Sequence, residues 1–443
     1  MEVLILALSF VILLAIGVPI AYSIGISAIL TILVSMPADI ALSTVAQRMG
    51  TGLDSFPLLA IPFFILAGQL MNAGGIARRL ISFAQTLIGW LPGALAHINI
   101  LANMLFGAIS GSAVAAASAI GGAMHQQMVD DGYDPEFNAA VNITSATTGM
   151  IIPPSNIMIV YSLSSGGVSI GALFVAGYIP GVLLGLALML VAGVMYVRKK
   201  HKLNSVKTTR DLPARSSFIA HFATGFKAFL AALPSLFLLF IIIGGIISGV
   251  FTATEASAIS VIYTLLLAFM YGEIKVSDLP EVLLNAVKTT SIVLILIATS
   301  MAMSWVLAFE NIPQNVSAAL LSISDNKVII LIIINLVLLV VGFFMDMTPA
   351  VLIFTPIFLP VVQELGVDPV HFGIIMVMNL CIGLCTPPVG SVLFVGAAVA
   401  NVSISRIIRP ILPLFVAMVI ILMITTYLPE LSLWLPGKLG MLK

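Results

Sequence analysis

Two short segments place adjacent prolines among glycine and small polar residues inside long apolar runs. The first is "IIPPSNIMIVY", Ile151 to Tyr161, and the second is "GLCTPPVG", Gly383 to Gly390. Proline has no N–H and blocks the helical turn before it, so carbonyl oxygens near each pair lose their helical partners. Freed carbonyls can bind a cation, and a helix that begins after the prolines offers unpaired amides to an anion. The chemistry that these residue types suggest is ion binding.

Composition shows where these segments must lie. The chain has 443 residues, of which 60% are hydrophobic and 8% charged, and its mean hydropathy is +1.20. Soluble domains carry roughly 25% charged residues, so the sequence predicts a polytopic membrane protein. The formal net charge is zero, which gives no reason to expect nucleic acid as a partner. The N-terminal "MEVLILALSF" has Glu2 where a signal peptide carries Lys or Arg, so we expect it to be the first membrane span.

Catalytic motifs are missing from the sequence. HExxH, GxSxG and GxxxxGK[ST] do not occur, so a membrane protease, an esterase and a P-loop ATPase lack support, and we do not expect an enzyme. The two cysteines, Cys381 and Cys385, flank Gly383 in an apolar segment and are expected to pack rather than to bind metal or form a disulfide.

An internal repeat positions the two proline motifs. A shift of 234 residues, the spacing between Gly132 and Gly366, aligns "GYDPEF" with "GVDPVH" and places Gly149 on Gly383. The same shift aligns Pro153-Pro154 with Pro387-Pro388 and one "VSI" with another. Apolar composition alone would not place Asp-Pro, Gly and Pro-Pro in the same order, so the chain is predicted to contain two related halves.

The orientation of each half follows from the basic segment between them. Residues 198–215 carry seven Lys or Arg against one Asp, which predicts a cytoplasmic linker. Counting spans away from it places "DDGYDPE" (Asp130 to Glu136) inside and "GVDP" (Gly366 to Pro369) outside, so the two halves have opposite orientations. Residues 97–128 and 328–363 must each begin and end on one side, which predicts two re-entrant helix hairpins. Non-helical backbone at membrane depth is tolerated only inside protein or beside a water-filled cavity.

The predicted fold is therefore an all-α polytopic membrane protein of two inverted-topology repeats, each with a re-entrant hairpin and a broken transmembrane helix. The first repeat spans residues 1–197, the linker 198–215 and the second repeat 216–443. Within the first we expect scaffold helices in 1–90, a hairpin and broken helix in 92–165 and a closing helix in 173–197. The corresponding parts of the second are 229–309 for the scaffold, 328–363 for the hairpin, 368–400 for the broken helix and 410–428 for the closing helix.

Inverted repeats with interrupted helices are typical of secondary transporters, whose sites lie at the breaks. A lone Pro-Pro pair is as well explained by a simple kink, but two pairs in register favour a site. Around the first break, the carbonyls of Gly149 to Ile152 are candidate cation ligands, and Ser155 and Asn156 begin the next helix. Asp346 is an acid in an apolar hairpin, which marks a functional candidate because of its cost in the membrane. The alternative is that Asp346 only caps the helix whose first turn holds Pro349.

Several longer motifs resemble a known family. "SFPLLAIPFFILAGQLMNAGG" (Ser55 to Gly75), "SGSAVAAASAIG" (Ser110 to Gly121) and "MDMTPAVLIFTPIFLPV" (Met345 to Val361) are similar to segments of the large membrane subunit of tripartite ATP-independent periplasmic (TRAP) transporters. So are "GVFTATEASAISVIYTLLL" from Gly249 and "DPVHFGIIMVMNLCIGLCTPPVG" from Asp368. The resemblance covers nearly the whole chain.

The resemblance implies a function. In this family a large subunit, which here is unfused, pairs with a small four-helix membrane subunit in the bacterial inner membrane. A soluble periplasmic binding protein delivers an organic acid such as sialic acid, a sugar acid or a C4-dicarboxylate. Sodium (Na⁺) drives symport, and the domain that holds the hairpins moves as an elevator against a scaffold.

The resemblance also implies site residues, which fall into three groups. The first sodium site would use Ser110, Gly111, Ser112, Gly149 and Pro153. The second would use Gly342, Asp346, Thr348, Gly383 and Thr386. The substrate would contact Ser110, Ser112, Ser155, Asn156 and Asp346. Some relatives carry an acid or a proline shortly after the first serines, where this chain has "AVAAAS", so the polar contacts at this tip can differ.

Two other functions remain open at this level. An anion channel or exporter working without a binding protein would give flux by itself, and a membrane scaffold would give no transport at all. Which acid is carried and how many sodium ions accompany it do not follow from the sequence.

Overall fold

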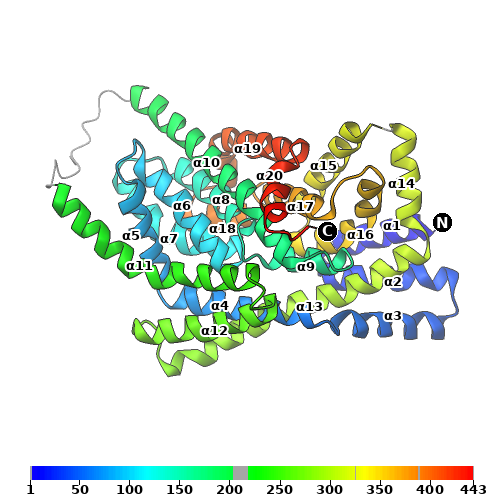
Figure 1. The fold of residues 1–443 in the computed structure, drawn as a ribbon. Coiled ribbons are helices and arrows are strands. Elements are labelled where there is room, and N and C mark those ends of the chain that lie inside the picture. Colours follow the sequence, from blue (N-terminus) through cyan, green and yellow to red (C-terminus); the bar gives the residue numbers. More distant parts are fainter. Residues whose placement is uncertain (1, 203–217, 325, 388–389, 443) are drawn as a thin grey trace.

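The computed structural model describes residues 2–202, 218–324, 326–387 and 390–442. Within these ranges the fold consists of helices and the turns that join them, with no β-strand (Figure 1). This confirms the all-α prediction. Most of the predicted basic linker, and Pro388 and Val389 of the second proline motif, lie outside the described residues.

The first half contains these elements in chain order: α1 (Glu2–Ala15), α2 (Ile20–Ser35), α3 (Ala38–Leu53), η1 (Phe56–Leu59), α4 (Ala60–Ala73), α5 (Ile76–Ile88), α6 (Ala94–Ser110), α7 (Ala113–Asp130), α8 (Pro135–Ala146), η2 (Thr148–Met150), α9 (Asn156–Ser164) and α10 (Ile170–Lys202). The second half contains α11 (Phe218–Ile247), α12 (Ala253–Met270), η3 (Val276–Asp278), α13 (Leu279–Phe309), α14 (Ile312–Ile323), α15 (Lys327–Phe344), α16 (Met347–Glu364), α17 (Pro369–Gly383), α18 (Ser391–Ala400), α19 (Ile404–Tyr427) and α20 (Glu430–Lys438). Seven helical stretches among the described residues are long and apolar enough to cross a membrane.

The order of elements in the first half recurs in the second. A helical hairpin (α6–α7, then α15–α16) leads to a short helix, a break and a second short helix, followed by a long closing helix. Helices α8 and α17 both begin at the proline of an Asp-Pro pair, 234 residues apart, and α10 and α19 begin at Ile170 and Ile404 with the same spacing. The opposite orientation of the halves across a membrane stays a prediction.

The observed bounds differ from the predicted ones in the scaffold. The prediction gave the span before α14 as about residues 290–309, but α13 starts at Leu279 and runs for 31 residues. Its first-half relative is split, because α3 ends at Leu53 and α4 starts only at Ala60, with Pro57 in the short turn η1 between them. At the start of α12, Thr252 and Glu255 form a reciprocal capping box.

The buried side chains form one large core and two small ones. The large core joins both hairpins and both broken helices with α10 and α19. A second core belongs to α2, α3, α13 and the start of α14, and a third to α4 and α12. In Figure 1, α13 runs along the lower part of the molecule, with α4 and α12 near one end and α2 and α3 near the other. Helices α2 and α3 therefore pack in a core apart from the hairpins, whereas α5 and much of α4 belong to the large core.

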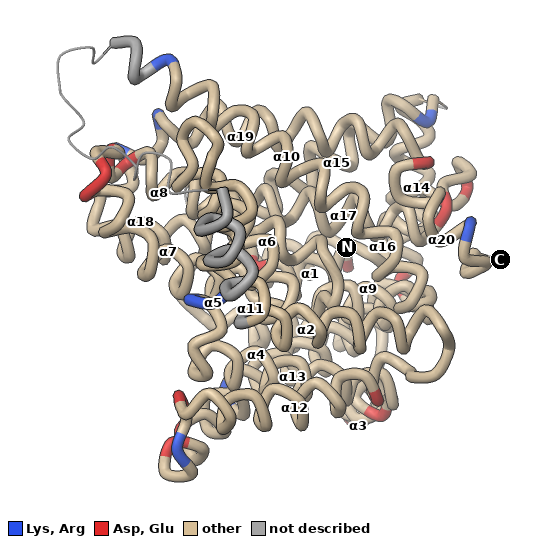
Figure 2. Tube along the Cα trace, turned by 60° about the vertical axis from the view of Figure 1, so that its left-hand side comes forward, with Lys and Arg blue, Asp and Glu red and all other residues tan. Residues whose placement is uncertain are grey.

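Charged residues lie mostly at two opposite sides of the molecule, and the helices between them are almost free of charge (Figure 2). Arg406, before α19 has completed its first turn, forms an ion pair with Glu136 in the first turn of α8. Both lie in segments predicted to be cytoplasmic. This distribution is what an apolar layer between two aqueous surfaces requires.

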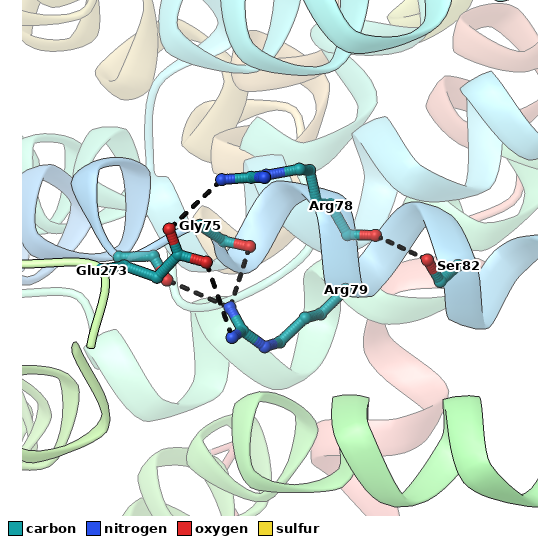
Figure 3. Close-up of polar contacts among 6 residues, drawn as sticks. Gly75, Arg78, Arg79, Ser82 and Glu273 are labelled. Atoms are coloured by element: carbon teal, nitrogen blue, oxygen red, sulfur yellow. Dashed lines mark hydrogen bonds and ion pairs between the residues drawn. The ribbon is translucent and has the colours of Figure 1, made fainter. Parts of the chain in front are cut away.

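A second ion-paired cluster joins the α4–α5 turn to the segment after α12 (Figure 3). Arg79 Nη1 donates to the carbonyls of Gly74 and Gly75, each at 3.2 Å, and its guanidinium lies 3.6 Å above the centre of the Tyr271 ring. Glu273 Oε1 is 3.7 Å from Arg79 Nη2, and Glu273 Oε2 is 3.2 Å from Arg78 Nη2. Arg79 is 22% exposed, whereas Arg78 is 73% exposed. Arg79 therefore caps the end of α4 from a partly desolvated position.

We predict that Arg79→Ala destabilises the protein by about 1–2 kcal/mol, because it removes two bonds to helix-end carbonyls and a cation–π contact. Arg78→Ala is the matched control and should change stability by less than about 0.5 kcal/mol, since an exposed ion pair contributes little. Thermal unfolding of the purified variants in detergent, followed by tryptophan fluorescence, measures both. Equal effects of the two substitutions would contradict the capping role of Arg79.

Candidate functional site

A cavity of about 540 Å³ lies where the two hairpin tips meet the helices that follow the breaks. Residues of the scaffold helices α4 and α13 also line the cavity. Gly68 of α4 lies directly against the first tip, and a Cβ there would be 2.8 Å from the Ser110 carbonyl oxygen. The cavity therefore has walls from both halves of the chain and from the scaffold.

The first tip is a turn of two residues, Gly111 and Ser112, between α6 and α7. Gly111 has φ +61°, in the left-handed region that favours glycine, and a Cβ at this position would be 2.8 Å from the Asn156 amide nitrogen. Ser112 caps α7, because its Oγ accepts a hydrogen bond from the Ala115 amide at 3.2 Å. The tip thus rests against the first residue of α9.

The second tip repeats this arrangement with different chemistry. Asp346 precedes α16, and its Oδ1 accepts a hydrogen bond from Ser391 Oγ at 3.5 Å. Gly111 and Asp346 are 235 residues apart, and so are Asn156 and Ser391, so the second tip also rests against the first residue of the helix that follows the break. Asp346 makes no side-chain capping bond to α16, so helix capping does not account for this exposed acid.

Each break packs against its hairpin through a pair of glycines. A Cβ on Gly149 would lie 2.4 Å from Gly107 Cα, and a Cβ on Gly383 would lie 2.6 Å from Gly342 Cα. Real Cβ atoms do not approach that closely, so the two backbones touch without side chains between them. The carbonyls around each break are therefore brought next to the helix that leads to the tip.

At the first break, several carbonyls are left without hydrogen bonds. Among the described residues, no donor reaches the oxygens of Gly149, Ile151 or Ile152, since the two prolines that follow have no N–H. Ser155 does not line the cavity: it is fully buried, and its Oγ donates to the Met150 carbonyl at 2.5 Å. Of the predicted carbonyl ligands, that of Met150 is therefore already bonded, and Ser155 has no contact with the cavity.

The second break is more fully bonded. The Gly383 carbonyl accepts from the Thr386 amide at 2.9 Å, and Thr386 Oγ1 donates to the Ile382 carbonyl at 2.8 Å. Within the described part of this break, the Cys385 carbonyl has no donor. Within the described residues, the two breaks are thus alike in backbone packing and differ in their local hydrogen bonds.

The two broken helices also contact each other. Cys381 Sγ donates to the Thr147 carbonyl at 3.4 Å, and Cys385 Sγ donates to the Ile143 carbonyl at 3.4 Å. Both thiols are buried. The prediction that these cysteines pack is confirmed, and their position ties one break to the other.

The electrostatics of the cavity come from helix ends. Four helices, α7, α9, α16 and α18, begin at its wall, and the N-terminal end of a helix carries partial positive charge. Among the described residues that line the cavity, Asp346 is the one with a charged side chain, and no Lys, Arg or His takes part. No group of three or more His, Cys, Asp or Glu side chains within the described ranges could hold a metal ion. The oxygens that the described wall offers to a cation are carbonyls, hydroxyls, side-chain amides and the Asp346 carboxylate.

Most predicted tip residues come together in the cavity. Its wall includes the following predicted residues: Ser110, Gly111, Ser112, Asn156, Asp346 and Thr348. Gly149, Pro153, Gly342, Gly383 and Thr386 lie behind it, in the breaks and the hairpin helix. The sequence reasoning missed five polar residues of the wall, namely Gln69, Asn72, Ser118, Thr289 and Ser391. Ser391 could have been found by allowing one extra residue in the repeat alignment after the second proline pair.

Comparison with solved structures identifies the class of fold. The structure resembles that of the YdaH transporter of Alcanivorax borkumensis with a TM-score of 0.63 and 13% identity, covering 91% of this chain and 89% of that one. At this identity the likeness shows the fold alone, which is that of a polytopic membrane transporter.

Comparison of sequences identifies the family. The family described as "Tripartite ATP-independent periplasmic transporter, DctM component" matches residues 7–431. Protein YgiK of Salmonella typhimurium, described as uncharacterized, is 55% identical over 97% of this chain and 95% of its own length. The C4-dicarboxylate TRAP transporter large permease protein DctM of Pseudomonas aeruginosa is 42% identical, covering 95% of each chain. The isethionate TRAP transporter permease protein DctMQ of Oleidesulfovibrio alaskensis is 40% identical over 97% of this chain and 65% of its own. The chain belongs to the DctM family of TRAP large permeases, which are transporter subunits and not enzymes.

We predict that Gly149→Ala and Gly383→Ala each cost about 1–3 kcal/mol of stability, because an added methyl forces two packed backbones apart. Gly122→Ala is the control: it lies inside α7 with nothing within 4 Å of the added Cβ, and alanine is the better helix former. Melting temperatures of the three variants check this. A Gly122→Ala protein that melts as low as the other two would contradict the glycine contact as the cause.

Proposed function

We propose that this chain is the translocation subunit of a sodium-coupled importer of an organic acid in the bacterial inner membrane. A small four-helix membrane subunit and a soluble periplasmic binding protein are its proposed partners. The observation that carries the proposal is the cavity, in which two hairpin tips and four helix starts converge on one exposed acid. Relatives named for C4-dicarboxylate and for isethionate transport support an organic anion as the substrate class.

The proposed sodium sites use the oxygens that the breaks leave without partners. At the first break these are the carbonyls of Gly149 and Ile151, together with the tip residues Ser110 to Ser112. At the second break, oxygens near Gly383 and Thr386 and the tip from Gly342 to Thr348 would serve. The Gly107–Gly149 and Gly342–Gly383 contacts bring each break to its own hairpin. A cation that bridges the two would hold the tip closed against the next helix.

Coupling follows from elements that the two kinds of site share. Asn156 and Ser391 begin the helices whose N-terminal ends face the cavity, and each also contacts a tip. A sodium ion that fixes a tip would therefore also fix one wall of the anion site. Such coupling requires that each ligand binds the closed tips more tightly than the open ones.

Movement of the hairpin unit past the scaffold is the proposed way to alternate access, as an elevator. The hairpins and broken helices share one core, whereas α2, α3 and α13 pack around another. The first tip meets α4 at Gly68, where no side chain stands between the backbones. A contact without interlocking side chains would let the hairpin unit slide along the scaffold.

We predict that uptake depends on sodium. The purified chain is reconstituted in liposomes with its small subunit and binding protein, and the acid supplied is the one that most raises the melting temperature of that binding protein. Uptake should fall at least about tenfold when sodium is replaced by potassium. Equal uptake in both salts would refute sodium coupling. Flux that persists without the binding protein would favour a channel or an exporter, and no flux in any arm would favour a scaffold.

We also predict that Asp346→Asn reduces sodium-dependent uptake by about tenfold or more, because it removes the only charged side chain in the described cavity wall. The melting temperature should stay close to that of the unmodified protein, since the carboxylate is exposed and makes one long hydrogen bond. Asp39→Asn, an exposed acid in the first turn of α3, is the control and should leave uptake unchanged. If the Asp346 variant transports normally, the acid has no part in the site.

A further inference from the structure

Scaffold helix α4 presents two amide side chains to the cavity. Gln69 and Asn72 are three residues apart, so they lie on neighbouring positions of one helix face, and both line the wall. Neither forms a hydrogen bond with any other described residue, although each has two donors and an acceptor. On the hairpin side, Asn156 and Ser118 line the same cavity and also have no hydrogen-bond partner within the described ranges. These groups are open to a ligand.

The polar part of the cavity lies toward one end of α4. Gln69 and Asn72 occupy its C-terminal part, whereas Ile61 and Ile65 line the cavity one to three turns earlier. Ser118 lies beyond the first tip on α7, and Thr289 faces the cavity from the first third of α13. A ligand held by the tips would therefore meet neutral hydrogen-bonding groups on one side and aliphatic side chains on the other.

The charge of the cavity limits the charge of the ligand. Among the described lining residues there is no cationic side chain, and the carboxylate of Asp346 is already present. Two sodium ions at the proposed sites would be balanced by Asp346 and one further negative charge. A loaded unit with no net charge is the least costly to move through an apolar layer. A dianion would leave one negative charge with no side-chain partner.

We infer that the substrate is an acid with one negative charge and several hydroxyl groups, and that Gln69 and Asn72 bind its hydroxyls. The inference rests on the proposed function and narrows its substrate class. Neutral amides recognise hydroxyl groups because they both donate and accept, whereas a second carboxylate would call for a cationic partner. Scaffold helix α4 thereby helps to determine which substrate the site binds.

The contact to α4 has a mechanical consequence. Gln69 and Asn72 belong to the scaffold, while the tips, Asn156 and Asp346 belong to the hairpin unit. If the hairpin unit moves, the amides remain with α4. They therefore contribute to affinity in the arrangement described here and not after the unit has moved past them.

The test measures binding to the purified complex of large and small subunits in sodium chloride. D-gluconate and N-acetylneuraminate are the hydroxylated acids with one charge, and succinate and fumarate are the dicarboxylates. At least one hydroxylated acid should raise the melting temperature by a few degrees, as a ligand specific for the folded state does, and the dicarboxylates should not. Gln69→Leu and Asn72→Leu should each weaken this acid about fivefold or more by titration. Gln85→Leu, an exposed amide on α5 away from the cavity, should not.

Each opposite result overturns the inference. These results are a larger shift with succinate or fumarate, no shift with either hydroxylated acid, or full affinity in both the Gln69 and Asn72 variants. The melting temperatures without ligand show whether the variants are folded. Sodium-dependent uptake of the binding protein's acid tests the proposed function separately, so a sodium-coupled transporter that prefers a dicarboxylate would refute this inference and leave that function intact.

Discussion

The contact of glycine against glycine, Gly107 with Gly149 and Gly342 with Gly383, is the constraint on which the site depends. A broken helix exposes carbonyl oxygens, and in an apolar layer such oxygens must be covered by protein or by a cavity. Bare backbones that touch provide this cover at the shortest possible distance. The hairpins therefore cover the backbone of the breaks. They are the elements that make a broken helix tolerable at this depth, and they bring their own tips to the same place.

The cavity obtains its polarity without basic side chains. Helix starts supply the positive potential, a single acid lies at one tip, and the other polar groups of the described wall are neutral amides and hydroxyls among aliphatic side chains. Fixed helix ends need no long flexible side chain to be ordered, so the potential is built into the backbone. The two halves differ in where the polar group lies. In the Gly111–Asn156 contact the amide belongs to the helix after the break, whereas in the Asp346–Ser391 contact the charge belongs to the tip.

Sequence reasoning recovered what depends on local chemistry and on the repeat. The proline pairs, Asp-Pro starts and small-residue tips predicted the hairpins, the breaks and the tip residues of the cavity wall. It failed where the outcome depends on packing between distant helices. Ser155 looked like a ligand because it follows the prolines, but its hydroxyl turns back to the Met150 carbonyl. Gln69 and Asn72 looked like ordinary residues of a span, since nothing in "AGQLMNAGG" shows which face of α4 meets the hairpin tip. Thr289 was missed because α13 begins at Leu279, earlier in the chain than the hydropathy of the sequence indicates.

The hydrogen bond from Cys381 to the carbonyl of Thr147 joins two residues that are 234 positions apart, which is the spacing of the repeat itself. Each is thus the counterpart of the other under the repeat. In the predicted inverted repeat, such a pair lies beside the two-fold axis that relates the halves, as residues at the centre of an isologous dimer interface do. The contact is therefore the place where the predicted symmetry of the two halves can be tested. In this chain the two counterparts are a cysteine and a threonine, whereas in a symmetric dimer one residue type would occupy both positions.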